Sequence, residues 1–184
     1  SVNFIGAPAL TGKAYRKYQA SHPVNTVVGA ALAVQLPYGD YNDERLLNLG
    51  GNRFVLRPQL GMVHTRGPWS FEMTGSVFLY EDNDKFYSDS TREQDPLFAL
   101  QSHLVYIAPE RWWLSLGVAH AWGGESEING FKKDVEKRDM LYGISAGVPV
   151  GSQSSVMIAY VAGRTSEDVG VDTDNISLAY SIRF

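Results

Sequence analysis

The sequence predicts an all-β fold, an antiparallel transmembrane β-barrel, and three observations lead to this class. Eight runs of about ten residues alternate between large apolar side chains and small or polar ones, which is the period of a β-strand. Charged residues gather between the runs, and the connections between runs alternate between long and short. No stretch approaches the roughly 20 apolar residues of a membrane-spanning helix.

The first four runs each place bulky apolar residues in one phase of the alternation. Val28 and Leu32 oppose Gly29 and Ala31 in the first run. The second run has Leu56, Leu60 and Met62 in its apolar phase, the third has Trp69, Phe71, Met73 and Leu79, and the fourth has Phe98, Leu100, Leu104 and Tyr106. A period of two with one apolar face predicts a strand with one face toward an apolar environment.

The last four runs repeat the pattern. Their apolar phases are Trp112, Leu114, Leu116, Val118 and Trp122; Met140, Tyr142, Ile144 and Val148; Val156, Ile158 and Tyr160; and Ile176, Leu178, Tyr180, Ile182 and Phe184. Residues 1–5 alternate in the same way, so we expect a partial strand there, followed by a periplasmic connection over residues 6–23. The whole chain, residues 1–184, is expected to be one barrel domain that lacks N-terminal strands.

The second face of these runs is mostly Gly, Ala, Ser and Gln, which suits the inside of a narrow barrel. Most charged residues lie in the stretches 37–52, 81–96, 124–139 and 164–174. The runs themselves are therefore nearly free of charged residues. A wall that faces lipid must lack them, because a basic residue at mid-bilayer costs about 2–4 kcal/mol even on a barrel surface. The apolar phase is therefore predicted to face lipid and the small phase to face the lumen.

The connections between runs predict the orientation of the barrel. Outer-membrane barrels have short periplasmic turns and longer extracellular loops, and the strict alternation of long and short connections here fits that rule. Aromatic residues near run ends fit interfacial girdles, although each could equally be an ordinary core or edge residue. These aromatics are Trp69, Tyr80, Tyr106, Trp112, Trp113 and Trp122.

A few polar residues fall in the inward phase and are candidates to line the lumen. They are Arg57, Gln59, Glu72, Thr74, Gln101, His103 and Arg183. Charged groups that line a pore set its selectivity. The alternative is that these groups pair with one another and fill a plugged interior.

Composition argues against covalent chemistry and against several partners. The chain has no Cys, its four His are far apart, and it has no nucleophile elbow of the GxSxG type, so we expect no enzyme activity, no cofactor and no metal site. A net charge of −4 offers no footprint for nucleic acid. The acidic stretch from Glu81 to Asp95 lacks the EF-hand pattern, so a solvated extracellular loop is favoured. A looser hypothesis is that such loops bind divalent ions that bridge to lipopolysaccharide phosphates.

Several segments, in order along nearly the whole chain, resemble an outer-membrane family. These segments are Asn3-Phe-Ile-Gly-Ala-Pro-Ala-Leu10, Leu36-Pro-Tyr-Gly-Asp-Tyr41, Asn48-Leu-Gly-Gly-Asn-Arg-Phe54, Gly67-Pro-Trp-Ser-Phe-Glu72, Asp82-Asn-Asp84, Arg92-Glu-Gln-Asp-Pro-Leu97 and Trp122-Gly-Gly124. The family is that of the meta-pathway phenol-degradation (MetA) proteins, often described as transporters. The resemblance implies a bacterial outer-membrane barrel of about twelve strands that passes small aromatic molecules. The alternative is a complete eight-stranded barrel with residues 1–23 as a leader.

The expected function is an outer-membrane channel or passive transporter for small hydrophobic or aromatic compounds. A structural barrel with a plugged lumen and functional surface loops stays open, as does a soluble lipid-binding barrel. The expected partners are membrane lipid, lipopolysaccharide, a small solute and the barrel-assembly machinery. The machinery would recognise the C-terminal strand, because this strand ends at Phe184 in phase with its apolar residues.

Overall fold

The chain folds into a curled antiparallel sheet in a computed structural model that describes residues 1–8, 10–133, 135–168 and 170–182. Neighbouring strands follow the chain in the order β1-β2-β3-β4-β7-β8-β11-β12-β13. Their bounds are β1 (Val2–Ile5), β2 (Val24–Gln35), β3 (Val55–Arg66), β4 (Trp69–Tyr80), β7 (Leu97–Ile107), β8 (Trp113–Gly123), β11 (Lys137–Val150), β12 (Ser154–Thr165) and β13 (Thr173–Ile182). The predicted fold class, with eight full strands and a partial N-terminal one, is confirmed.

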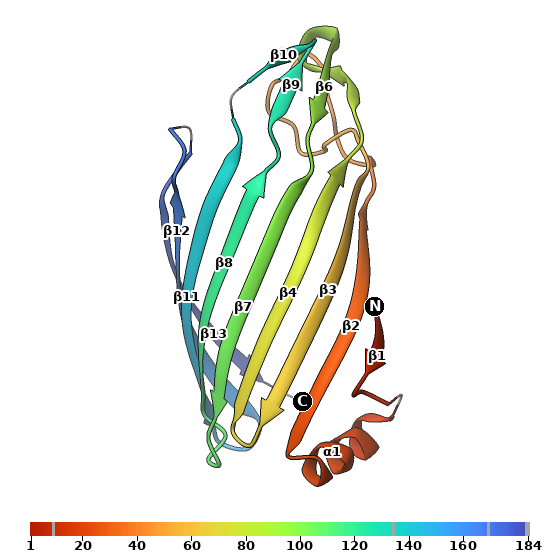
Figure 1. Cartoon of the computed structure of the whole chain (residues 1–184). Coiled ribbons are helices and arrows are strands. Elements are labelled where there is room, and N and C mark those ends of the chain that lie inside the picture. The colour runs from red at the N-terminus through yellow and green to blue at the C-terminus, as the bar shows by residue number, and fades with distance from the viewer. Residues whose placement is uncertain (9, 134, 169, 183–184) are drawn as a thin grey trace.

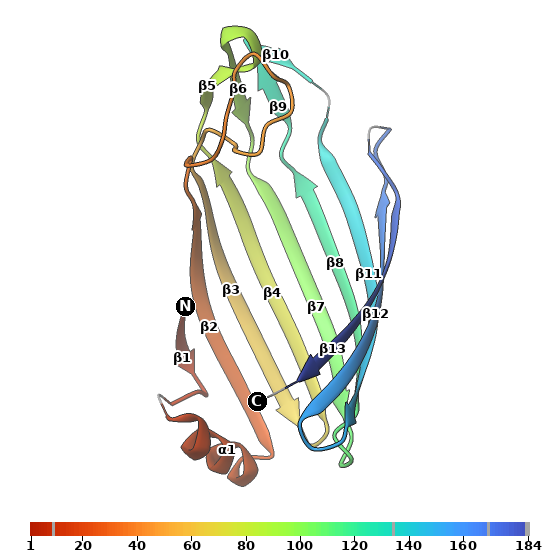
Figure 2. The same cartoon turned by 180° about the vertical axis from the view of Figure 1, so that it is seen from behind.

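The sheet forms a partial barrel with two edges. Figures 1 and 2 show the strands wrapping around a common axis, with β12 and β13 on the opposite wall from β3 and β4. Over the described residues β1 pairs only with β2 and β13 only with β12, so the eight full strands do not close on one another. Hydrocarbon offers no hydrogen-bond partner to such edges, so a membrane-spanning barrel needs both of them covered.

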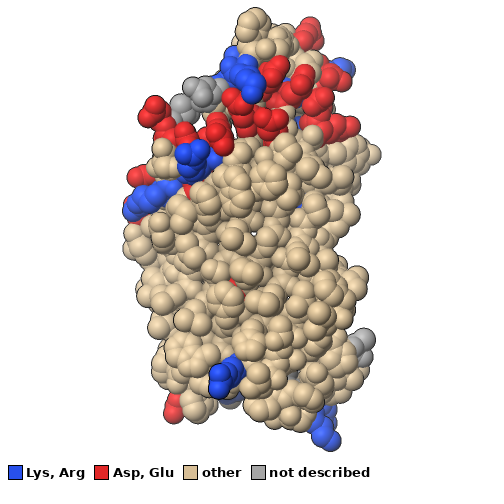
Figure 3. All heavy atoms as spheres, in the orientation of Figure 1, with Lys and Arg blue, Asp and Glu red and all other residues tan. Residues whose placement is uncertain are grey.

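The convex face carries the bulky apolar residues of every full strand. Leu60, Leu116 and Ile158 are examples, and each of these side chains is at least half exposed. Figure 3 looks onto this face and shows a broad band with almost no charged residue, between charged groups at the two ends. A large exposed apolar surface of this kind marks an interaction surface for an apolar medium.

Two aromatic clusters bound the apolar band on the convex face. Near the short turns, the ring of Tyr106 lies 4.9 Å from Trp69 and 5.5 Å from Trp112 between centroids. Near the long connections, Trp122 lies 5.7 Å from Phe98. Phe98 and Tyr106 are eight residues apart on β7, about 26 Å along the strand, which is comparable to the apolar band of about 25 Å on outer-membrane barrels.

The long connections form a second sheet at one end of the barrel. The sequence predicts only loops for these connections. The strand order of the second sheet is β10 (Phe131–Lys132), β9 (Ser126–Ile128), β6 (Ser90–Gln94) and β5 (Asn83–Phe86), with the 3-10 turn η1 (Tyr87–Asp89) between β5 and β6. Figures 1 and 2 show this small sheet together with the loop between β2 and β3 over the barrel end. The end with the long connections therefore carries ordered strands as well as loops.

A short helix, α1 (Gly12–Ser21), lies within the expected connection 6–23 at the opposite end of the barrel. The amide of Tyr15 donates to the Thr11 carbonyl oxygen at 2.8 Å in its first turn, and the helix ends just before His22 and Pro23. A proline disfavours helical geometry in the residue before it, so Pro23 explains why the helix ends before His22. Among the described residues no helix is both long and apolar enough to span a membrane.

Asn83 joins the loop after β2 to the second sheet. Its side chain is only 3% exposed, and its Nδ2 donates to Tyr41 Oη at 2.9 Å while Asn52 Nδ2 donates to its Oδ1 at 2.9 Å. The backbone amide of Lys85 also donates to Oδ1 at 3.1 Å. One buried amide thus holds three segments of the barrel end together.

Substituting Asn83→Ala should loosen the loop at residues 37–52. We expect a loss of about 1–3 kcal/mol in the free energy of unfolding, since buried partners lose their hydrogen bonds. Tyr41→Phe removes one acceptor only and should have a smaller effect. Limited proteolysis of the loop, together with denaturant unfolding in detergent, measures both. Equal proteolysis rates in wild type and Asn83→Ala would contradict this role.

Candidate channel interior

The concave face of the sheet consists mostly of small and polar residues in transverse rows, with aromatic rings near the end with the long connections. One row runs through Gly29, Gly61, Thr74, Gln101 and Ala119, which are partners on successive strands. Because side chains alternate between faces, this row lies opposite the bulky convex residues. Small residues here leave open space along the axis of the curled sheet.

The structure places the described lumen candidates on this concave face. Glu72 is the cross-strand partner of His103, and Thr74 is the partner of Gln101. Arg57 and Gln59 lie in the same phase on β3, with Gln59 paired to Ser76. Arg183 lies outside the described residues, as does Phe184. That these side chains select solutes stays a prediction.

The six described candidates do not pair with one another in the described part of the chain. No hydrogen bond or ion pair joins any two of them there, and Arg57 Nη2 instead donates to Ser76 Oγ at 3.3 Å. The ring of His103 packs over Gly117, where a methyl group would lie 2.6 Å from Nδ1. The interior is therefore not filled by ion pairs among these residues.

Three arginines on the concave side lie over aromatic rings. The guanidinium carbon of Arg57 is 4.4 Å from the Phe78 ring centroid, that of Arg53 is 4.5 Å from Tyr80, and that of Arg92 is 5.4 Å from Phe86. Such stacking leaves the in-plane N–H groups of guanidinium free for other partners.

Sequence reasoning singled out Arg57 alone among these three arginines. Arg53 could have been found, because it is four residues before Arg57 and shares its phase of the alternation. Arg92 gave no such signal, since its place depends on the second sheet. Arg53 donates to Gln94 Oε1 on β6, and Arg92 donates to Ser126 Oγ on β9 at 3.1 Å.

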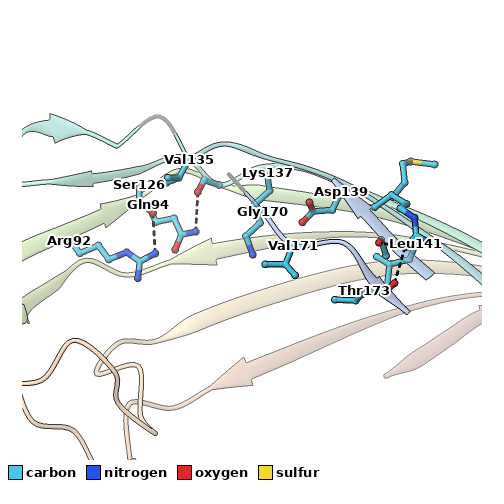
Figure 4. Close-up of a pocket in the computed structure, with 14 residues that line it drawn as sticks. Arg92, Gln94, Ser126, Val135, Lys137, Asp139, Leu141, Gly170, Val171 and Thr173 are labelled. Atoms are coloured by element: carbon cyan, nitrogen blue, oxygen red, sulfur yellow. Dashed lines mark hydrogen bonds between the residues drawn. The ribbon is translucent and has the colours of Figure 1, made fainter. Parts of the chain in front are cut away.

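A cavity of about 510 Å³ lies at the mouth, between the second sheet and strands β11 to β13. Figure 4 shows Arg92, Gln94 and Ser126 at one end of this cavity and Asp139, Leu141 and Thr173 at the other, with Lys137 between them. Gln94 Nε2 donates to the Gly124 carbonyl oxygen at 3.0 Å, which fixes its amide at the wall. The cavity can hold a small organic solute, and its wall carries both basic and acidic groups.

Metal-ligating side chains do not gather in the part of the chain that the structure describes. Within those ranges, no group of three or more His, Asp or Glu side chains could hold a metal ion. His64 contacts Thr26 Oγ1 at 2.8 Å and His120 contacts the Asp139 carbonyl oxygen at 3.2 Å, which accounts for both rings as hydrogen-bonded neighbours.

An antiparallel sheet that is curled into a partial barrel, apolar outside and small or polar inside, belongs to the class of β-barrel proteins that span membranes with strands. Comparison with known proteins agrees with this class. The model of the family described as "Putative MetA-pathway of phenol degradation" matches residues 3–177. The chain belongs to this family, which confirms the resemblance drawn from the sequence.

One solved structure is similar over most of the chain: the crystal structure of the COG4313 outer membrane channel from Pseudomonas putida. The two share 29% sequence identity with a TM-score of 0.73, over 84% of this chain and 58% of that channel. The present chain therefore spans somewhat more than half of the length of the solved channel. None of the curated proteins compared with this chain is significantly similar to it.

Proposed function

We propose that this chain forms the wall of an outer-membrane channel that passes small hydrophobic or aromatic compounds without covalent chemistry. The observation that carries the proposal is the apolar convex band, which ends at aromatic clusters where the polar connections begin. An apolar band of this kind on a barrel faces the hydrocarbon of a lipid bilayer. The solved outer-membrane channel supports the location and the channel role, and the phenol-degradation family supports an aromatic solute.

A structural barrel that acts through its surface loops is the second candidate. The ordered second sheet and the Asn83 contacts favour it, because they present an ordered surface outside the barrel wall. Two further proposals apply to either candidate: contacts of the acidic long connections with lipopolysaccharide, and recognition of the C-terminal residues, which include Phe184, by the barrel-assembly machinery.

Flux measurements on the full-length protein separate the two candidates. In proteoliposomes we expect ion conductance and uptake of a small aromatic solute that crosses lipid slowly, such as phenylalanine. Ala119→Trp places a large ring on the concave face, next to Gln101, and should reduce both signals. Val118→Trp places the same ring on the convex face and should leave both near wild type.

The results of these flux measurements distinguish a channel from a structural barrel with a plugged lumen. Loss of flux in Ala119→Trp with retention in Val118→Trp supports passage along the concave face. Flux no higher than in protein-free vesicles for the wild type would overturn the channel and leave the structural barrel. Equal loss in both variants, with normal folding, would place the path elsewhere than on this face.

A further inference from the structure

Arg92, Arg53 and Arg57 form a basic path from the mouth into the barrel. Arg53 and Arg57 are four residues apart on one extended segment, at most about 14 Å along the chain. Gln94 links Arg53 to β6, where Arg92 lies two residues away on the same side of the strand. A solute that enters at the mouth therefore meets three guanidinium groups in succession.

Acidic side chains do not neutralise this path. Among the described residues, none of the three arginines forms an ion pair within 4.0 Å. Burial and the positive charge of Arg92 lower the pKa of Arg53, while Asp82 acts on it from a distance in the opposite sense. Asp139 is the acidic group at the mouth cavity, where Arg92 and Lys137 are the inward basic ones. Glu72 on the concave face and Glu81, which accepts from the Phe54 amide beside Arg53, are further acidic groups near the path, but within the described ranges neither forms an ion pair with its arginines.

Two N–H groups on the path are buried and without a partner in the described part of the chain. They are Arg53 Nη1 and Arg57 Nε. A buried donor that is left unsatisfied is unfavourable, and guanidinium donors bind carboxylate oxygens in a planar, charge-assisted geometry. The rings of Tyr80 and Phe78 cover one face of each guanidinium and present an apolar surface beside the free edge. Both arginine side chains are only half-buried, so the rest of each guanidinium and the ring beside it can meet a carboxylate and an apolar body at one place.

We infer that this arginine path makes the channel selective for small organic anions, in particular carboxylates with an aromatic or apolar body. The inference rests on the proposed channel function and narrows its solute class. Each guanidinium replaces part of the hydration of the carboxylate as it passes, and the neighbouring ring contacts the apolar body. If only water bound beside the guanidinium groups, the channel would show no preference for anions.

Ion selectivity of the full-length protein in planar bilayers tests the inference. Under a potassium chloride gradient, the wild type should have a reversal potential on the anion-selective side. Arg53→Gln and Arg57→Gln should each lower the anion-over-cation permeability ratio by roughly threefold to tenfold, as expected for the loss of one charge-assisted contact. Arg45→Gln removes the same charge from the exposed loop between β2 and β3 and should change the ratio little.

Uptake of two aromatic ions of similar size gives an independent readout. Proteoliposomes should take up benzoate faster than benzyltrimethylammonium, and Arg57→Gln should slow benzoate about as much as it lowers the permeability ratio. Conductance with no anion preference, or equal slowing of both ions, would overturn the inference and leave the proposed channel intact. No conductance in wild-type protein would overturn the proposed channel and this inference with it.

Discussion

Replacing Leu116 by lysine is expected to destabilise the full-length protein in a lipid bilayer by about 2–4 kcal/mol, the cost of a basic residue near the midplane on the lipid face of a barrel. Leu116 lies near the middle of β8 and is 50% exposed on the convex face. The exposed position makes the expectation specific, since a lysine on a water-facing strand would cost little. Unfolding in bilayers of short-chain lipid measures the change.

Leu47→Lys is the matched control for that substitution. Leu47 is 88% exposed in the long connection between β2 and β3, where water is the expected surrounding. The change there should stay within about 0.5 kcal/mol. If Leu116→Lys proved as mild as Leu47→Lys, the convex band would face water and the lipid-facing interpretation would be wrong.

The second large effect is expected at Gly123, where β8 leaves the barrel wall. This glycine has φ of +92°, and a Cβ atom there would lie 2.7 Å from the Pro96 carbonyl oxygen. Gly123→Val should cost about 2–5 kcal/mol, because a β-branched residue is strained at positive φ and the backbone of Pro96 must move. Denaturant unfolding measures the loss, and proteolysis at residues 124–133 reports displacement of the second sheet.

Gly75→Val separates this effect from a general intolerance of valine for glycine. Gly75 lies in β4 without a positive φ, and a Cβ atom there would meet nothing within 4 Å. We expect its unfolding free energy to stay within about 0.5 kcal/mol of wild type. Similar losses in both variants would contradict a special backbone requirement at Gly123.

The strands of the barrel wall could be predicted because each has a signal within its own sequence. Alternation of bulky and small residues is local, so β7 and β8 were predicted nearly to their ends. The prediction stopped short on β11, which begins at Lys137 and not at Met140. Arg138 interrupts the apolar phase and is flanked by the charged Lys137 and Asp139, yet all three continue the ladder with β8.

The second sheet and helix α1 could not be predicted in the same way. Strand β6, Ser90–Gln94, is polar on both faces, so its pairing with β9 depends on the barrel strands that bring the two connections together. The helix had weaker signals in Thr11 at its start and Pro23 after its end. The arginine path could not be predicted either, because Arg92 and Arg53 are brought together only by the pairing of segments that are distant in the sequence.

The most direct test compares two neighbouring positions on β7. Because the chain has no Cys, Leu100→Cys and Gln101→Cys each give one labelling site, at the same height on opposite faces of the sheet. With a fluorescent label on reconstituted full-length protein, position 100 should be quenched by lipid-bound nitroxide and position 101 by a water-soluble quencher. The reverse pattern, or aqueous quenching at both positions, would contradict an apolar face toward lipid and a small, polar face toward the axis.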